Sequence, residues 1–162
     1  MYINRAHTTV LILTAAMVSF RVIAQAPEKP AASQSAKKHD KTQAEVASKA
    51  SFATVKPESP EVKKAIDAKK LDVAFKLIGK PGAFKGTVDK AYAPKSNSLV
   101  ILDFDKDYKS ALTAVVKAEN FSKIPDLKTL EGKAVVVTGT FIEYQGKAQI
   151  EISKLDQIKF IK

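Results

Sequence analysis

The chain has 162 residues, enough for one domain of ordinary size, and 45% of them are hydrophobic, as in a typical globular protein. Lysine and arginine number 27 against 17 acidic residues, so the formal net charge of +10 favours anionic partners. The absence of cysteine excludes disulfides, thiolate nucleophiles, cysteine-bound metals and lipid modification at a cysteine.

The first 24 residues have the pattern of a signal peptide. A short segment with Arg5 precedes an apolar run over 8–20, and Arg21 ends that run well short of the about 20 apolar residues that span a bilayer. Small residues around position 24 favour cleavage after Ala24. This pattern predicts export to the periplasm or the outside of a bacterial cell, with an uncleaved membrane anchor as the alternative.

Residues 25–58 are rich in Ala, Lys, Ser and Pro and poor in large apolar side chains. Such a segment buries too little apolar surface to offset the entropy of ordering, so a disordered linker is predicted. Within it, Thr42 and Glu45 match a capping box, which allows a marginal helix over 43–50.

Residues 59–79 are predicted to form one amphipathic helix. Ser59 is a suitable N-cap, Pro60 suits the first helical position, and Gly79 marks the end of the apolar periodicity. The lysines of this segment form either a ridge that faces nucleic acid or, as the pattern favours, the solvated side of a helix that packs on the next domain.

From residue 80 onward the pattern is typical of strands, which are predicted over 84–92, 98–104, 111–117, 133–144 and 147–153. A short helix is expected over 120–127, between the third and fourth strands, and a final short extended stretch over 157–161. This order predicts a mainly β fold, a five-stranded Greek-key barrel of the OB type over residues 80–162. Gly86 and Gly139 fall within strands, where a side chain would obstruct sharp curvature or a close backbone approach.

Residues 79–162 contain several short motifs, namely Leu102-Asp103-Phe104, Thr113-Ala114-Val115-Val116, Gly132-Lys133 with Val137-x-Gly139, Tyr144-x-Gly146 and Gln157-Ile158. With these motifs the segment resembles small OB-fold modules of exported bacterial proteins, which are also found attached to thermonuclease-type and other proteins that process nucleic acid. Members of this family usually carry an aromatic residue where this chain has Leu112. The resemblance implies the OB fold and the role of a binding accessory that lacks the enzyme.

The chemistry of the predicted barrel argues against catalysis. Both histidines, His7 and His39, precede it, and no arginine follows Arg21. Without histidine or cysteine the usual general bases and nucleophile–base pairs are missing, so we expect no enzyme activity and no cofactor.

One segment has the beginning of a calcium-binding loop, namely Asp103-x-Asp105-x-Asp107. An EF-hand loop needs glycine at its sixth position and glutamate at its twelfth, where this chain has Tyr108 and Ala114. The segment is therefore predicted to be a hairpin tip with solvated acids, and no metal site is expected.

The OB fold places its usual ligand site on the second and third strands and on the loops that join strands one to two and four to five. Those two loops carry Tyr92, Lys95 and Asn97, and Tyr144 and Lys147. Tyrosines beside lysines on neighbouring loops can stack bases and neutralise phosphates. These five residues form the candidate ligand site, and simple packing at the barrel rim is the alternative.

The sequence thus predicts a non-catalytic, monomeric, exported OB-fold module that binds single-stranded nucleic acid or another polyanion. The positive charge argues only weakly for this function, because residues 81–162 carry thirteen lysines against ten acidic residues. The alternative function is an interaction module for another protein or for the cell envelope.

Overall fold

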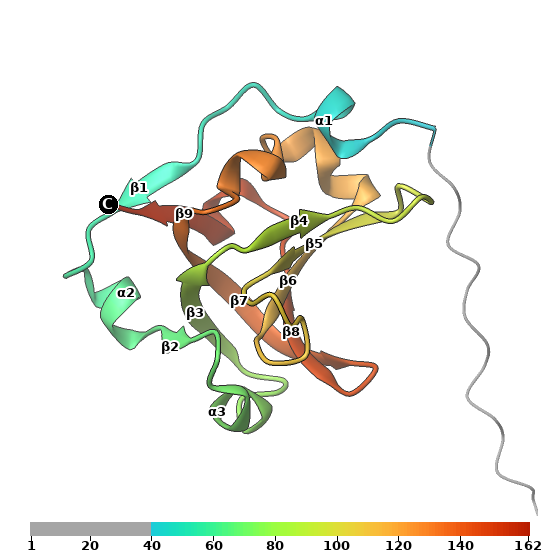
Figure 1. Ribbon diagram of the computed structural model, residues 1–162. Helices are drawn as coiled ribbons and strands as arrows, with labels where there is room; N and C mark the ends of the chain where they lie inside the picture. The colour runs from blue at the N-terminus through green and yellow to red at the C-terminus, as the bar shows by residue number, and fades with distance from the viewer. Residues whose placement is uncertain (1–39) are drawn as a thin grey trace, which may run out of the picture. The chain divides into compact units, whose positions relative to one another are not determined.

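The structure, a computed structural model, describes residues 40–162 (Figure 1). The predicted signal peptide and the first part of the predicted linker fall within residues 1–39 and lie outside these residues. No helix within 40–162 has the length and apolar character needed to cross a bilayer.

The described chain is mainly β, with nine strands joined in one sheet that curls round on itself (Figure 1). The strands are β1 (Ala53–Val55), β2 (Ile66–Asp67), β3 (Pro81–Thr87), β4 (Lys90–Tyr92), β5 (Leu99–Asp103), β6 (Thr113–Lys117), β7 (Ala134–Tyr144), β8 (Lys147–Glu151) and β9 (Ile158–Ile161). The helical segments are short, and they are α1 (Gln43–Val46), α2 (Pro60–Lys64), α3 (Leu71–Phe75), η1 (Ala118–Lys123), η2 (Leu127–Leu130) and η3 (Leu155–Gln157).

The strand pairing gives the sheet the order of an OB-type fold. β4, β5 and β6 pair antiparallel, β6 pairs parallel with β8, and β8 pairs antiparallel with β7. β7 then pairs antiparallel with β3, which directly precedes β4 in the chain and so brings the ends of the curled sheet together. The helical segments η1 and η2 lie between β6 and β7, where a short helix is predicted.

The predicted number of five strands is wrong. The first predicted strand divides at Val88 and Asp89, because the Val88 amide donates to the Lys133 carbonyl whereas the Asp89 amide donates to the Asp103 carbonyl. The first half of the predicted strand is therefore β3, which pairs with β7, and the second half is β4, which pairs with β5. The short extended stretch near the C-terminus forms β9, and β1 and β2 come from segments in which no strand is predicted.

The core lies inside the curled sheet because inward and outward side chains alternate along the strands. Leu102 on β5, Ala114 on β6 and Ile150 on β8 are fully buried, while their neighbours in sequence face the other way. Phe84 packs edge-on against Phe104, with ring centroids 5.0 Å apart. Residues of η1, of η2 and of the link between them close the interior, since Phe121, Ile124, Leu127 and Leu130 belong to the same buried cluster.

The segment predicted as one helix over 59–79 differs in the structure. Ser59 caps α2 as expected, but the helix ends at Lys64. Residues 66 and 67 then pair with β3, and the Ala68 amide donates to the Lys85 carbonyl. These tertiary hydrogen bonds replace the helical ones, so the apolar periodicity of this segment reflects its contact with the sheet and not one continuous helix.

The segment predicted as a disordered linker also differs over residues 40–58. The Thr42–Glu45 capping interaction is present, with the Glu45 carboxylate accepting the Thr42 amide at 2.6 Å. The buried amide of Gln43 bonds the backbone of residues 124, 125 and 127. β1 pairs in parallel with β9, and the ring of Phe52 lies 5.5 Å from that of Phe160. Composition misses this order because a few specific contacts, and not overall apolar content, hold the segment.

The two mid-strand glycines occupy positions where neighbouring atoms leave no room for a side chain. A Cβ atom at Gly86 would lie 2.9 Å from the Phe104 ring and 3.0 Å from the Ala68 side chain. A Cβ atom at Gly139 would lie 2.6 Å from the Ile150 side chain. The close approach expected from their positions in the strands is therefore present.

Candidate functional site

A groove of about 420 Å³ lies on the outer face of the sheet, over β4, β5, β6 and β8 and the loops beside them. Three tyrosines, three lysines and a few other polar groups line it, and we refer to it as the tyrosine groove. Its residues are Lys90, Tyr92, Ile101, Asp103, Lys106, Tyr108, Thr113, Tyr144, Gln145, Lys147 and Gln149.

The floor of the groove is a row of polar residues that crosses four strands. Asp103 on β5 stands opposite Lys90 on β4 and Thr113 on β6. Thr113 in turn stands opposite Gln149 on β8. The residues that alternate with this row, such as Leu102, are buried in the core, so the row faces outward by the two-residue period of a strand.

The walls of the groove are aromatic. Tyr92 is 46% exposed, Tyr108 49% and Tyr144 58%. Within residues 40–162 the only other exposed large hydrophobic side chain is Phe75, which is outside the groove. The exposed tyrosines of the described chain therefore all line one groove, and a contiguous exposed patch of this kind is typical of an interaction site.

A tight hairpin turn presents Tyr144 and Lys147 side by side. Gln145 and Gly146 both have positive φ, 51° and 74°, and the flanking residues Tyr144 and Lys147 pair across β7 and β8. Two central residues with positive φ are characteristic of a two-residue type I′ hairpin, and glycine suits the second of them. The strands predicted over 133–144 and 147–153 leave two residues between them for this turn, which fixes these two side chains at one end of the groove.

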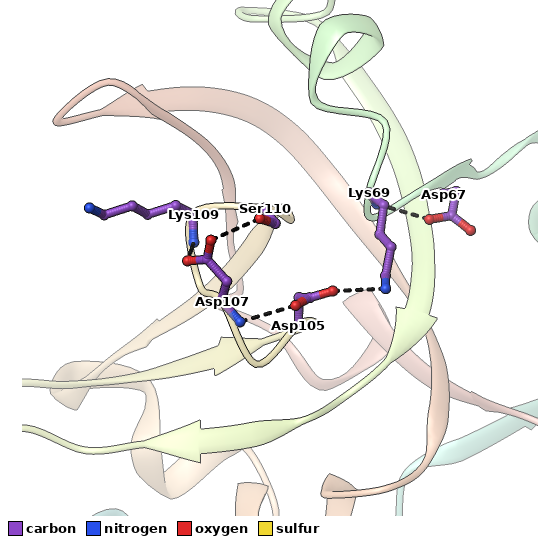
Figure 2. Close-up of polar contacts among 6 residues, drawn as sticks. All are labelled: Asp67, Lys69, Asp105, Asp107, Lys109 and Ser110. Carbon is purple, nitrogen blue, oxygen red and sulfur yellow. Dashed lines mark hydrogen bonds and ion pairs between the residues drawn. The ribbon is translucent and has the colours of Figure 1, made fainter.

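The loop between β5 and β6, which carries Lys106 and Tyr108, is held by its own carboxylates (Figure 2). Asp105 accepts the Asp107 amide at 3.0 Å and pairs with Lys69 at 2.8 Å. Asp107 accepts the Lys109 amide and the Ser110 hydroxyl, each at 3.0 Å. These hydrogen bonds hold the loop in a series of local turns, and the turns position the side chains that line the groove.

The same hydrogen bonds explain why the pKa values of Asp105 and Asp107 are lowered. The ion-paired hydrogen bond from Lys69 lowers the pKa of Asp105, and the Lys109 amide lowers the pKa of Asp107. Asp103 lies instead on the groove floor. Within 40–162 no cluster of three metal-ligating residues is present, and the three carboxylates of the sequence motif have different surroundings.

The groove has more positive than negative charge. Lys90, Lys106 and Lys147 line it, against the single carboxylate of Asp103. None of these three lysines is in an ion pair with another residue of the described chain. The Lys147 ammonium lies 3.6 Å from the centroid of the Tyr108 ring, a close cation–π contact.

Asp103 is the unusual group of the floor. Partial burial raises the pKa of its carboxyl, and the positive charges of Lys147 and Lys90 oppose that effect. Within residues 40–162 its carboxylate forms no ion pair and receives no hydrogen bond from another side chain or amide. It is an acceptor with free capacity that faces the groove.

Three of the five residues predicted for the ligand site meet in the tyrosine groove, namely Tyr92, Tyr144 and Lys147. Lys95 and Asn97 do not line it, since they lie in the turn after β4, where Asn97 has a positive φ of 49°.

The floor and the third wall of the groove are formed by residues outside the predicted ligand site. Asp103, Thr113 and Gln149 form that floor with Lys90, and Tyr108 and Lys106 come from the long loop. A signal for the floor is present in the alternation of β5, because Leu102 is inward and Asp103 must then face outward. No pattern in the loop indicates that Tyr108 reaches the same groove.

A second hollow, of about 720 Å³, lies beside β3. Its charges balance, since three lysines are matched by three aspartates, and Lys69 and Asp105 already pair with each other. No tyrosine lines it. The charged residues are Lys69, Lys85, Lys106, Asp67, Asp89 and Asp105.

Fold and site together define an OB-type β domain with an aromatic, lysine-bearing groove on its outer face. No family model matches the chain, and no curated protein matches it in sequence. Among solved structures, a protein described as an aspartyl-tRNA synthetase from Leishmania major Friedlin shares 12% identity with a TM-score of 0.45, over 73% of this chain and 24% of that one. An aspartyl-tRNA synthetase from Entamoeba histolytica gives 12% and 0.45, over 70% and 25%.

The hypothetical protein YgiW from E. coli is a third similar structure, with 10% identity and a TM-score of 0.38 over 69% of this chain and 99% of that one. This chain spans about a quarter of each synthetase. All three TM-scores are below 0.5, so the assignment of the fold stands on the strand pairing described above.

Proposed function

We propose that this protein binds single-stranded nucleic acid in the tyrosine groove. The observation that carries the proposal is the meeting of three exposed tyrosines and three lysines without ion-pair partners at one groove. Aromatic rings stack on bases of any sequence, and lysines neutralise the phosphates that connect them. A duplex hides its base faces, so the tyrosines favour single strands.

We propose that the role is binding without catalysis. The groove offers tyrosine, lysine, threonine, glutamine and one carboxylate, a set suited to stacking, hydrogen bonding and charge neutralisation. Export remains a proposal that rests on the pattern of residues 1–24, which would place the groove in the periplasm or outside the cell.

The test is a fluorescence anisotropy titration of the purified protein with labelled oligo(dT) of about 12 nucleotides, a length within the usual site size of an OB fold. Salt is varied from about 50 to about 200 mM, and affinity should fall with a logarithmic slope of about −0.7 for each phosphate neutralised. A duplex of the same length should bind more weakly. Absence of binding at the lowest salt, both to oligo(dT) and to a strand of mixed sequence and the same length, would overturn the proposal and leave the protein- or envelope-interaction alternative.

Two lysines give a matched pair for this titration. Lys106→Ala removes a groove lysine and should reduce the salt slope by about 0.7. Lys95→Ala removes an exposed lysine that does not line the groove, and it should leave the slope unchanged. Equal slopes for the two variants would contradict the assignment of the phosphate contacts to the groove.

Acid should strengthen binding to oligo(dT). Burial raises the pKa of Asp103, so this carboxyl takes up its proton at a higher pH than an ordinary aspartate does when the solution is acidified. Protonation removes the one negative charge of the groove. We expect the affinity to rise as the pH falls from neutral into the acid range, measured by anisotropy, and thymine does not titrate there.

Asp103→Asn is the control for this pH effect. The variant should bind more tightly than the wild type at neutral pH and should show a flat profile. Its stability should not suffer there, because a raised folded-state pKa gives stability that is present below the unfolded-state pKa and lost as the pH rises through the folded-state value. A pH dependence that persists in Asp103→Asn would contradict this origin.

A further inference from the structure

The floor of the tyrosine groove holds hydrogen-bonding groups that have no partner within the described residues. The Asp103 carboxylate, the Thr113 hydroxyl and the Gln149 amide form no side-chain hydrogen bond there, and they stand in register on three adjacent strands. Stacking on tyrosine and charge neutralisation by lysine require none of them. Thr113 is buried, whereas Asp103 and Gln149 are half-buried in the groove, where the edges of bases stacked on the tyrosines would lie.

Asp103 is the group of this row with the clearest chemical preference. An ionised carboxylate only accepts hydrogen bonds, and its two oxygens can accept two parallel N–H groups at once. The Watson–Crick edge of guanine offers two adjacent donors, N1–H and the 2-amino group. Thymine and uracil offer one imide N–H between two carbonyl oxygens, which a carboxylate repels.

Asp103 should lower the affinity of the groove for a polyanion that has no bases. It places a negative charge, partly buried, between lysines that would otherwise attract phosphate freely. When a strand occupies the groove, it displaces the water that hydrates this carboxylate. A base edge with hydrogen-bond donors offsets that cost, because its donors replace the hydrogen bonds of the lost water. A strand without such donors leaves the carboxylate desolvated and without a hydrogen-bond partner, so the protein should bind that strand more weakly.

We propose that Asp103 makes the tyrosine groove selective for guanine-containing single strands over strands of thymine or uracil. The proposal rests on the proposed function, and it assigns to this carboxylate the reading of the N1–H and 2-amino donors of a base held between the tyrosine walls. Lysines and tyrosines then supply affinity, and Asp103 supplies discrimination.

The test compares three labelled oligonucleotides of equal length on the wild-type protein: alternating thymine–guanine, alternating thymine–hypoxanthine and oligo(dT). Hypoxanthine keeps N1–H and lacks the 2-amino group. A lithium salt prevents four-stranded guanine structures. The thymine–guanine strand should bind at least about fivefold more tightly than oligo(dT), as a good bidentate base contact does, and the hypoxanthine strand should lie between them.

Two variants separate base reading from charge. Asp103→Asn should reduce the ratio between the thymine–guanine strand and oligo(dT) to near one, while its affinity for inorganic polyphosphate, which has no bases, should rise. Asp156→Asn removes an exposed carboxylate outside the groove and should keep the wild-type ratio. Unchanged thermal melting and circular dichroism establish that each variant is folded.

The outcomes are distinct. Equal affinity of the wild-type protein for all three oligonucleotides would overturn the inference and leave the proposed function intact, and this comparison needs no variant. A ratio that survives in Asp103→Asn would overturn the assignment to this carboxylate. Binding to none of the oligonucleotides would overturn the proposed function itself.

Discussion

Replacing Tyr92, Tyr108 and Tyr144 together by alanine is expected to weaken the binding of oligo(dT) by at least about a hundredfold, because each base that stacks on an aromatic ring contributes about 1 to 3 kcal/mol. The three rings are about half exposed, so their removal empties the walls of the groove without opening the core. Anisotropy titration at one fixed salt concentration measures the loss, and each single variant should show a smaller share of it.

Phe75→Ala is the matched control for this loss. Phe75 is 40% exposed on α3 and lies outside the groove, so it is an aromatic residue of similar exposure without the proposed role. Its replacement should leave oligo(dT) binding unchanged. Inorganic polyphosphate offers no base to stack, so the triple variant should still bind it. If the triple variant bound oligo(dT) with the affinity of the wild type, the proposed stacking of bases on these tyrosines would be contradicted.

Gly139→Val is expected to lower the free energy of unfolding by at least about 2 kcal/mol. A Cβ atom here would lie 2.6 Å from the Ile150 side chain, which is fully buried, and 3.0 Å from the Gln157 amide nitrogen. That amide donates to the carbonyls of residues 138 and 151, and its oxygen accepts the amides of residues 153 and 154. The new side chain must displace a packed methyl group and the centre of this network.

Urea denaturation measures the loss, and Thr140→Val is its control. Thr140 is the next residue of β7 and is exposed, so a valine there has the same shape without the contacts. The control should change the free energy of unfolding by less than about 0.5 kcal/mol. A Gly139→Val protein that unfolds at the wild-type urea concentration would contradict the close approach at this strand.

The barrel strands could be predicted because their alternation records which face is buried. The residues that alternate along β5 and β8 place Leu102 and Ile150 in the core, and the predicted ranges overlap both strands. The segment before them could not be predicted in the same way. Ala65 and Ala68 are equally compatible with a helix face and with contact against a sheet, and the pairing with β3 decides between them.

The candidate site could be predicted where a strand end or a local turn positions it, as at Tyr92 and at the hairpin of Tyr144 and Lys147. Gln145-Gly146 identifies a hairpin, so Tyr144 and Lys147 follow as neighbours at its ends. Tyr108 enters the groove through the fold of a long loop, whose course depends on an ion pair between Asp105 and Lys69, residues far apart in the sequence. A contact between residues far apart in the sequence produces no periodic pattern of residues from which it could be predicted.

The position of the Lys147 ammonium over the Tyr108 ring links two events that are usually independent. A base that stacks on the same face of this ring must first displace the ammonium, and that displacement costs the cation–π attraction. Under the proposed function, an ion pair between the displaced ammonium and a phosphate would offset that cost. A free nucleoside or a free phosphate would make only one of these two contacts, so the ring and the lysine would favour a ligand that carries both a base and a phosphate.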